Sequence, residues 1–147
     1  MTIVKETQDR RTQTREMMNK WISERQQMLV LFCQLAGLEP YTPDKPVKKQ
    51  LEDFCQVMID YIAFGHFEVF DRISRGEERR VDVLTVAAEV YPRVTEVAEV
   101  VVAFNDKYDC ADHEPPLEQL YDDLSQLGEK LAARIEMEDR IVSSMMA

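Results

Sequence analysis

The stretch LEDFCQVMIDYIAFGHFEVFDRI, residues 51–73, decides the fold class of this 147-residue chain. Up to Gly65 its apolar residues recur every three or four positions, which predicts an amphipathic helix. The recurring residues are Leu51, Phe54, Cys55, Met58, Ile59 and Ile62. Gly65 is expected to interrupt this helix, and residues 66–73 then resume as a short amphipathic helix.

The same periodicity continues on both sides of this stretch. Before it, the apolar positions are Met17, Trp21, Met28, Leu31, Phe32 and Leu35. After it, residues 81–108 follow a helical pattern that Pro92 is expected to kink or split. In the last segment Leu117, Leu124 and Leu131 recur every seven residues, which predicts a long helix packed along its neighbours.

The sequence therefore predicts an all-α fold. We expect a single up-and-down helical bundle of four to five main helices over residues 1–147, with a short extra helix after Gly65. The segment 38–47 contains three prolines and is expected to be an extended connector. Residues 1–13 are polar and are expected to be disordered or frayed.

Charge and composition exclude several classes of protein. The formal net charge is −10, and the imbalance lies in residues 51–147, which have 9 basic and 22 acidic side chains. Such an acidic chain is not expected to bind DNA directly, because phosphate neutralisation needs clustered Lys and Arg. The sequence contains no run of about 18 uncharged apolar residues, so it predicts no membrane span. The N-terminus lacks an apolar signal core and the three cysteines form no C-x-x-C pair, so we expect a cytoplasmic protein.

The motifs of catalysis and metal binding are missing from the sequence. The only histidines are His66 and His113, and neither follows a Glu by three residues, as a di-metal site in a bundle requires. There is no G-x-S-x-G turn and no Gly-rich phosphate loop. We therefore expect no catalytic residues, no metal and no cofactor.

The segment 53–72 is unusually rich in aromatic residues. It holds five of the twelve aromatic residues of the chain, namely Phe54, Tyr61, Phe64, Phe67 and Phe70. One helix directs only part of this set to its own core. Two interpretations stay open: a core packed around a helix break, or an exposed aromatic surface beside Asp60 that binds a protein partner.

Residues 51–73 also resemble the Rsd/AlgQ family of anti-sigma factors. They are similar to a family pattern close to L-D-D-F-C-Q-x-x-x-D-Y-x-x-x-G-H-F-x-x-x-x-R-I. Further similarity lies in Trp21, in QLAGLEP (34–40), in the Tyr-Pro pair at 91–92 and in LSQLGEKLAARIEMEDRIV (124–142). The likeness covers most of the chain from Trp21 onward and is weaker around residues 76–90 and at the C-terminal end.

The resemblance implies a partner and a binding site. The partner would be the C-terminal, promoter-recognising domain of the housekeeping sigma factor, whose association with core RNA polymerase this chain would hinder. Asp60 and Phe67 lie in the matching block and are the main predicted contacts, with Asp60 facing a basic side chain and Phe67 an apolar pocket. Tyr61, Phe64, Trp21 and Arg25 are predicted neighbours, and Trp21 is equally compatible with the core.

Two other functions stay open at this level. A helical adaptor could bind a different regulatory protein through the same aromatic surface, and a metal-binding bundle protein is a more distant alternative. The sequence does not define the oligomeric state of the free chain.

Overall fold

The computed structural model describes residues 2–147, and their side chains from residue 8 onward. Its elements in chain order are α1 (Thr2–Ala36), α2 (Val47–Phe64), the π-helix η1 (Gly65–Phe70), α3 (Asp71–Ser74), α4 (Val81–Lys107), the 3₁₀-helix η2 (Leu117–Gln119) and α5 (Leu120–Met146). Residues 2–147 contain no strand, so the predicted all-α class is confirmed. No helix in these residues is long and apolar enough to cross a membrane.

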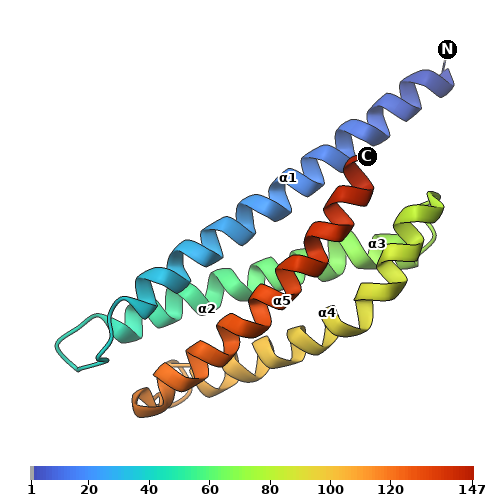
Figure 1. Cartoon of the computed structure of the whole chain (residues 1–147). Helices are drawn as coiled ribbons and strands as arrows, with labels where there is room; N and C mark the ends of the chain where they lie inside the picture. Colours follow the sequence, from blue (N-terminus) through green and yellow to red (C-terminus); the bar gives the residue numbers. More distant parts are fainter. Residues whose placement is uncertain (1) are drawn as a thin grey trace.

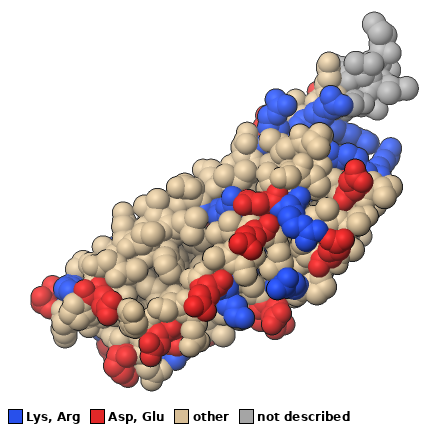
Figure 2. Space-filling model, viewed as in Figure 1, with Lys and Arg blue, Asp and Glu red and all other residues tan. Residues whose placement is uncertain are grey.

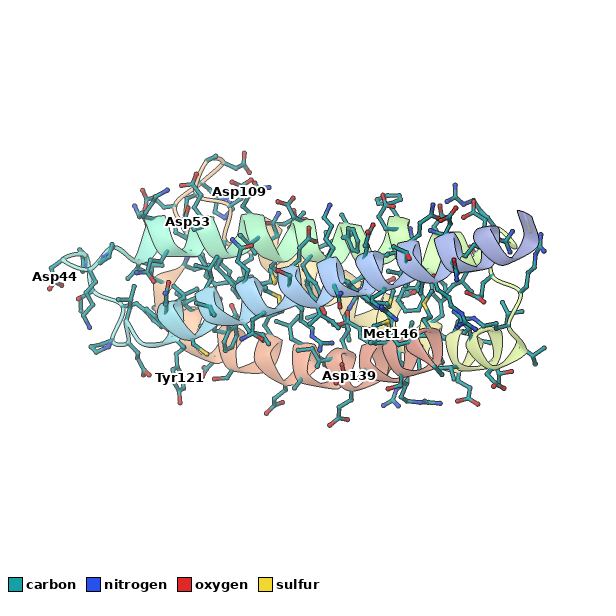
Figure 3. The ribbon with its side chains drawn as sticks, turned by 90° about the horizontal axis from the view of Figure 1, so that it is seen from above. Asp44, Asp53, Asp109, Tyr121, Asp139 and Met146 are labelled. Carbon is teal, nitrogen blue, oxygen red and sulfur yellow. The ribbon has the colours of Figure 1, made fainter. Side chains whose placement is uncertain are left out.

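The four long helices run alternately up and down (Figure 1). The connector 37–46 joins α1 to α2, and a second connector, 108–116, joins α4 to α5 at the same end of the molecule. Seen from above, α1 lies over the space between α2 and α5 (Figure 3). Helix packing is closest within the two hairpins, α1 with α2 and α4 with α5. The predicted up-and-down bundle is therefore confirmed.

Apolar stripes from all four long helices meet in one core. The core residues with the largest apolar side chains include Trp21 of α1, Phe54 and Tyr61 of α2, and Tyr108 after α4. The α5 helix adds Leu120, Leu124, Leu127 and Leu131. Burying an aliphatic or aromatic side chain of this size contributes about 1.5–3 kcal/mol to folding. The helical spacing directs these side chains into one core, and their burial there stabilises the bundle.

The N-terminal segment differs from its prediction. Helix α1 begins at Thr2, so residues 2–13 are helical, whereas the sequence predicted disorder or fraying. Met1 lies outside the described residues. The sequence has no glycine or proline before Gly37. The helical conformation of the packed part of α1 can therefore extend toward Thr2 without meeting a helix-breaking residue.

Helix α2 ends at Phe64 and a short extra helical segment begins at Gly65, as predicted, but the backbone stays helical through the glycine. Its φ and ψ are −58° and −44°, ordinary right-handed helical values, and its N–H donates to the carbonyls of Ile62 and Tyr61. The helix widens into the π-helical turns of η1 and then passes into α3. A π-helical segment inside an α-helix shifts the phase of the residues that follow and is often found at functional sites.

Pro92 lies inside α4 without dividing it. Helix α4 is one helix from Val81 to Lys107, and it changes direction in its yellow part, close to the proline (Figure 1). Proline removes one backbone donor, and the Thr95 hydroxyl donates to the Tyr91 carbonyl at 2.9 Å in the same turn. Both features bend helices, so the predicted kink is present and the predicted split is not.

Candidate protein-binding surface

The outer face of α2 and η1 presents an acidic residue followed by two aromatic rings. Asp60 and Phe64 are spaced four residues apart, which places them along one side of α2, and Phe67 follows in the first turn of η1. Asp60 is exposed and accepts a hydrogen bond from the Gln56 amide at 3.2 Å. Phe64 is half-buried, and Phe67 is 61% exposed. Phe67 is the most exposed aromatic ring among the described side chains, and it marks a candidate contact because a second exposed ring, Tyr91, lies across the groove described below.

Helix α1 supplies the charged border of this surface. The Lys20 ammonium lies 5.2 Å from the centroid of the Phe64 ring, a cation–π distance. Glu24 lies beside Asp60: partial burial raises the pKa of Glu24, Lys20 opposes that rise, and repulsion from Asp60 adds to it. We call the five residues Lys20, Glu24, Asp60, Phe64 and Phe67 the Asp60–Phe67 surface.

Phe67 also borders an apolar groove between α2 and α4. The groove has a volume of about 230 Å³ and is lined mainly by carbon atoms from Ile59, Ala63, Phe67, Tyr91, Val94 and Ala98. Phe67 and Tyr91 are both exposed at its edges. The groove therefore extends the exposed aromatic surface from the outside of α2 toward α4.

Trp21 and Tyr61, two of the residues predicted at the binding site, are buried instead. Trp21 is 2% exposed, and its ring meets Phe70 edge-on with a centroid separation of 6.0 Å. Tyr61 is 0% exposed. Neither side chain is accessible to a partner in this structure. The aromatic segment thus combines the two interpretations left open by the sequence, with Phe54, Tyr61 and Phe70 in the core and Phe67 outside.

A buried polar cluster lies directly under this surface. The Tyr61 hydroxyl donates to Glu138 of α5, and Arg134 Nε donates to the other carboxylate oxygen of Glu138 at 2.7 Å. Arg134 Nη1 also donates to the Val94 carbonyl of α4 at 3.2 Å. Arg134 and Glu138 are 1% and 0% exposed. The cluster therefore ties α2, α4 and α5 together at the level of Tyr61.

Arg25 extends the buried cluster to the surface. Its Nη1 lies 3.5 Å from Glu138 and 2.9 Å from Asp139, so it joins α1 to α5. Asp139 is the exposed end of this chain of contacts, on the α5 side of the molecule (Figure 3). Arg25 is only slightly exposed, which makes it a positioning residue more than a free contact for a partner.

The sequence predicted helix-surface or inter-helix pairs for Arg134, Glu138 and Asp139, but it did not predict that the first two are buried in the core. Glu138 falls on the apolar stripe of α5, between Leu131 and Ile141, and Arg134 precedes it by one helical turn. A carboxylate on a core-facing stripe needs a buried cation or donor, because an unpaired buried charge is costly. Burial, and then the nearby Glu138, raise the pKa of Tyr61 well above its usual value, so Tyr61 stays protonated and donates.

The described side chains offer no cluster of three or more His, Cys, Asp or Glu placed to hold a metal ion. His113 lies in the connector between α4 and α5, with Asp112 beside it and its Nε2 2.7 Å from the Lys107 carbonyl. These neighbours raise the pKa of His113, the carbonyl contact being the largest cause.

Comparison with known proteins agrees with this geometry. The family described as "Regulator of RNA polymerase sigma(70) subunit, Rsd/AlgQ" matches residues 1–146. This chain belongs to the Rsd/AlgQ family. Two similar members are each named Regulator of sigma D. The one from Yersinia enterocolitica is 30% identical over 86% of this chain and 78% of its own length. The one from Salmonella paratyphi A is 31% identical over 86% of this chain and 80% of its own length. No solved structure matches the chain with significance.

The residues that match the Rsd/AlgQ family include both the exposed surface and the buried cluster beneath it. The match includes α1, α2, η1, α4 and all of α5, so every element that positions Asp60 and Phe67 lies within it.

Proposed function

We propose that this member of the Rsd/AlgQ family binds the C-terminal, promoter-recognising domain of the housekeeping sigma factor and hinders its association with core RNA polymerase. The observation that carries the proposal is the exposed Phe67 of η1, which follows the exposed Asp60 of α2 along one continuous helical segment. Family relatives named Regulator of sigma D support the partner. The complex is stoichiometric, and no catalysis takes part.

The proposed contact has an apolar centre and a charged rim. Phe67 would fill an apolar pocket of the partner, since a buried aromatic ring is a typical anchor of protein interfaces. Asp60 would pair with a basic side chain, and Lys20 and Phe64 would border the contact. Trp21, Tyr61 and Arg25 would act indirectly, by holding α2 and η1 in place.

The charge distribution suits a domain that normally binds DNA. A promoter-recognising surface must be basic to approach phosphates, and residues 51–147 of this chain have a strong excess of carboxylates. Electrostatic complementarity would speed the encounter and favour this partner over acidic ones. The same excess argues against direct DNA binding by the Asp60–Phe67 surface. We also propose the cytoplasm as the site of action, because RNA polymerase works there.

The test is competition for sigma between this chain and core RNA polymerase. Purified chain is added to sigma before core polymerase, and holoenzyme is measured by native gel or by transcription from a sigma-dependent promoter. We expect the chain to reduce holoenzyme, and Phe67→Ala to lose most of this effect. Tyr121→Ala is the matched control, because Tyr121 is also an exposed aromatic residue, 53% exposed, but lies at the connector end of α5 (Figure 3).

Two results would contradict the proposal. Holoenzyme formation that the wild-type chain leaves unchanged would mean that the partner is another regulatory protein, as the adaptor alternative holds. If Phe67→Ala and Tyr121→Ala lose the ability to reduce holoenzyme equally, the Asp60–Phe67 surface is not where sigma binds.

A further inference from the structure

The end of the molecule near the N-terminus reverses the overall charge of the chain. Figure 2 shows Lys and Arg gathered where α1 projects past the other helices, whereas acidic residues dominate farther along the same face. A cleft of about 820 Å³ opens at this end, between residues 10–15 of α1, the segment 76–80 and the last residues of the chain, 145–147. Its cationic side chains are Arg10, Arg11, Arg15, Arg72, Arg79 and Arg80.

The backbone after α3 is built to close this cleft. Gly76 adopts a φ of +81°, a left-handed value that favours glycine, and this turn directs residues 77–80 back along the bundle. Arg80 then fixes the segment: its Nη1 donates to the Met145 carbonyl of α5 at 3.0 Å, and its Nε donates to Glu78 at the same distance. Arg72 lies 3.4 Å from Glu77. These contacts hold one wall of the cleft in place.

The remaining arginines have no such internal role. Among the side chains that the structure describes, Arg10, Arg11, Arg15 and Arg79 form no ion pair, and all four are exposed. Guanidinium groups bind carboxylates through paired hydrogen bonds and are less strongly hydrated than ammonium groups. Like charges gathered from α1 and from the segment 76–80 repel one another, and a bound anion would relieve that repulsion.

The rest of the cleft indicates what kind of anion fits. Met145 and Met146 contribute apolar, adaptable surface between the arginines, and Met146 is 44% exposed. Glu77 and Glu78 also line the cleft and would oppose a dense array of phosphates. An extended nucleic acid would in addition run onto the acidic surface beyond the cleft, whereas a short peptide would not.

We propose that this arginine cleft is a second protein-binding site, which takes an acidic peptide segment carrying apolar side chains. Carboxylates of the peptide pair with Arg10, Arg11, Arg15 and Arg79, and its apolar side chains lie on Met145 and Met146. The cleft and the Asp60–Phe67 surface are built from different residues, so the two sites bind their partners independently of each other.

The test is fluorescence anisotropy of a short labelled peptide of glutamate–glutamate–leucine–methionine repeats, titrated with the full chain. The peptide should bind, more weakly as salt is raised, and should bind more tightly than an oligoglutamate of equal charge. Arg11→Gln with Arg79→Gln should weaken binding roughly tenfold, the effect of removing two partly exposed charge pairs. Arg93→Gln with Lys130→Gln is the control, because it changes the net charge equally at exposed positions outside the cleft.

Three outcomes would overturn the proposal. Equal weakening in both double variants would mean that only the net charge matters. Tighter binding of a short DNA duplex than of the peptide would assign the cleft to nucleic acid. Self-association of the chain in sedimentation, abolished by the Arg11 and Arg79 substitutions, would mean that a second copy occupies the cleft.

Discussion

Glu138 is the residue that connects the core to the proposed binding surface. Its two carboxylate oxygens accept hydrogen bonds from Tyr61 and Arg134, while Arg25 lies 3.5 Å away. A buried ion pair of this kind adds little net stability over apolar residues, but removal of one partner strands the other charge. The cluster is therefore better understood as a device that holds three helices in register.

This interpretation predicts strong coupling between the two charges. Glu138→Leu should reduce the free energy of unfolding by about 3–5 kcal/mol, because Arg134 is left buried and unpaired. Arg134→Met with Glu138→Leu should cost less than Glu138→Leu alone. Urea denaturation of the single and double variants gives the coupling directly. Additive losses would mean that the two side chains do not act as a pair.

Alkaline pH should destabilise the fold through Tyr61 and Cys55. Burial raises the pKa of the Cys55 thiol to about 12, and that of Tyr61 is raised well above its usual value. Both groups are neutral in the folded and unfolded chains at neutral pH. Above about pH 9 the unfolded chain ionises first, so stability should fall as pH rises from there. Tyr61→Phe should reduce the decrease in unfolding free energy above about pH 10. Urea denaturation at several pH values measures this decrease.

At the scale of the element, η1 is the feature that most affects the site. Gly65 begins this π-helix and is packed against the core: a Cβ there would lie 2.9 Å from Trp21 Nε1 and 3.1 Å from Arg134 Nη2. The glycine therefore permits close approach of helices and is not needed for an unusual backbone angle. Residues 65–70 place Phe67 outward and Val69 and Phe70 inward.

Gly65→Ala should consequently disturb both stability and binding. Overpacking against Trp21 and Arg134 should cost about 1–3 kcal/mol of unfolding free energy and shift Phe67 with η1. Gly76→Ala is a useful comparison, since a Cβ there meets nothing within 4 Å but the φ of +81° is strained. It should lose stability without weakening sigma binding. Equal binding by the wild type and Gly65→Ala would show that η1 does not position the contact.

The elements that periodicity describes well were predictable from sequence, and those set by tertiary packing were not. The four long helices follow from their apolar spacing. The passage through Gly65 could not be predicted, because local propensity treats glycine as a break and gives no weight to the Trp21 ring packed against it. The resemblance predicted Tyr61 at the binding surface near Phe67, whereas its hydroxyl donates to Glu138 in the core. The resemblance supplied Asp60 and Phe67, and both are exposed.

At the scale of the whole molecule, positive charge is concentrated at one end of an acidic chain. The arginine cleft lies near the N-terminal end of α1, and the Asp60–Phe67 surface lies on the side of an otherwise acidic bundle. Long-range steering by the acidic part should be screened by salt, whereas Phe67 burial should not. A rise in ionic strength should therefore slow association with sigma more than it speeds dissociation. Surface plasmon resonance at several salt concentrations measures both rates.

Calorimetric titration of the chain with the isolated C-terminal domain of its housekeeping sigma factor, at two salt concentrations, tests the central claim most directly. The account predicts saturable one-to-one binding that weakens with salt. Asp60→Arg should weaken it at least tenfold without unfolding the bundle, whereas Glu99→Arg, an equal charge change at an exposed position of α4, should have a smaller effect. The absence of binding to a folded sigma domain, or equal affinity for the wild type and Asp60→Arg, would contradict the account.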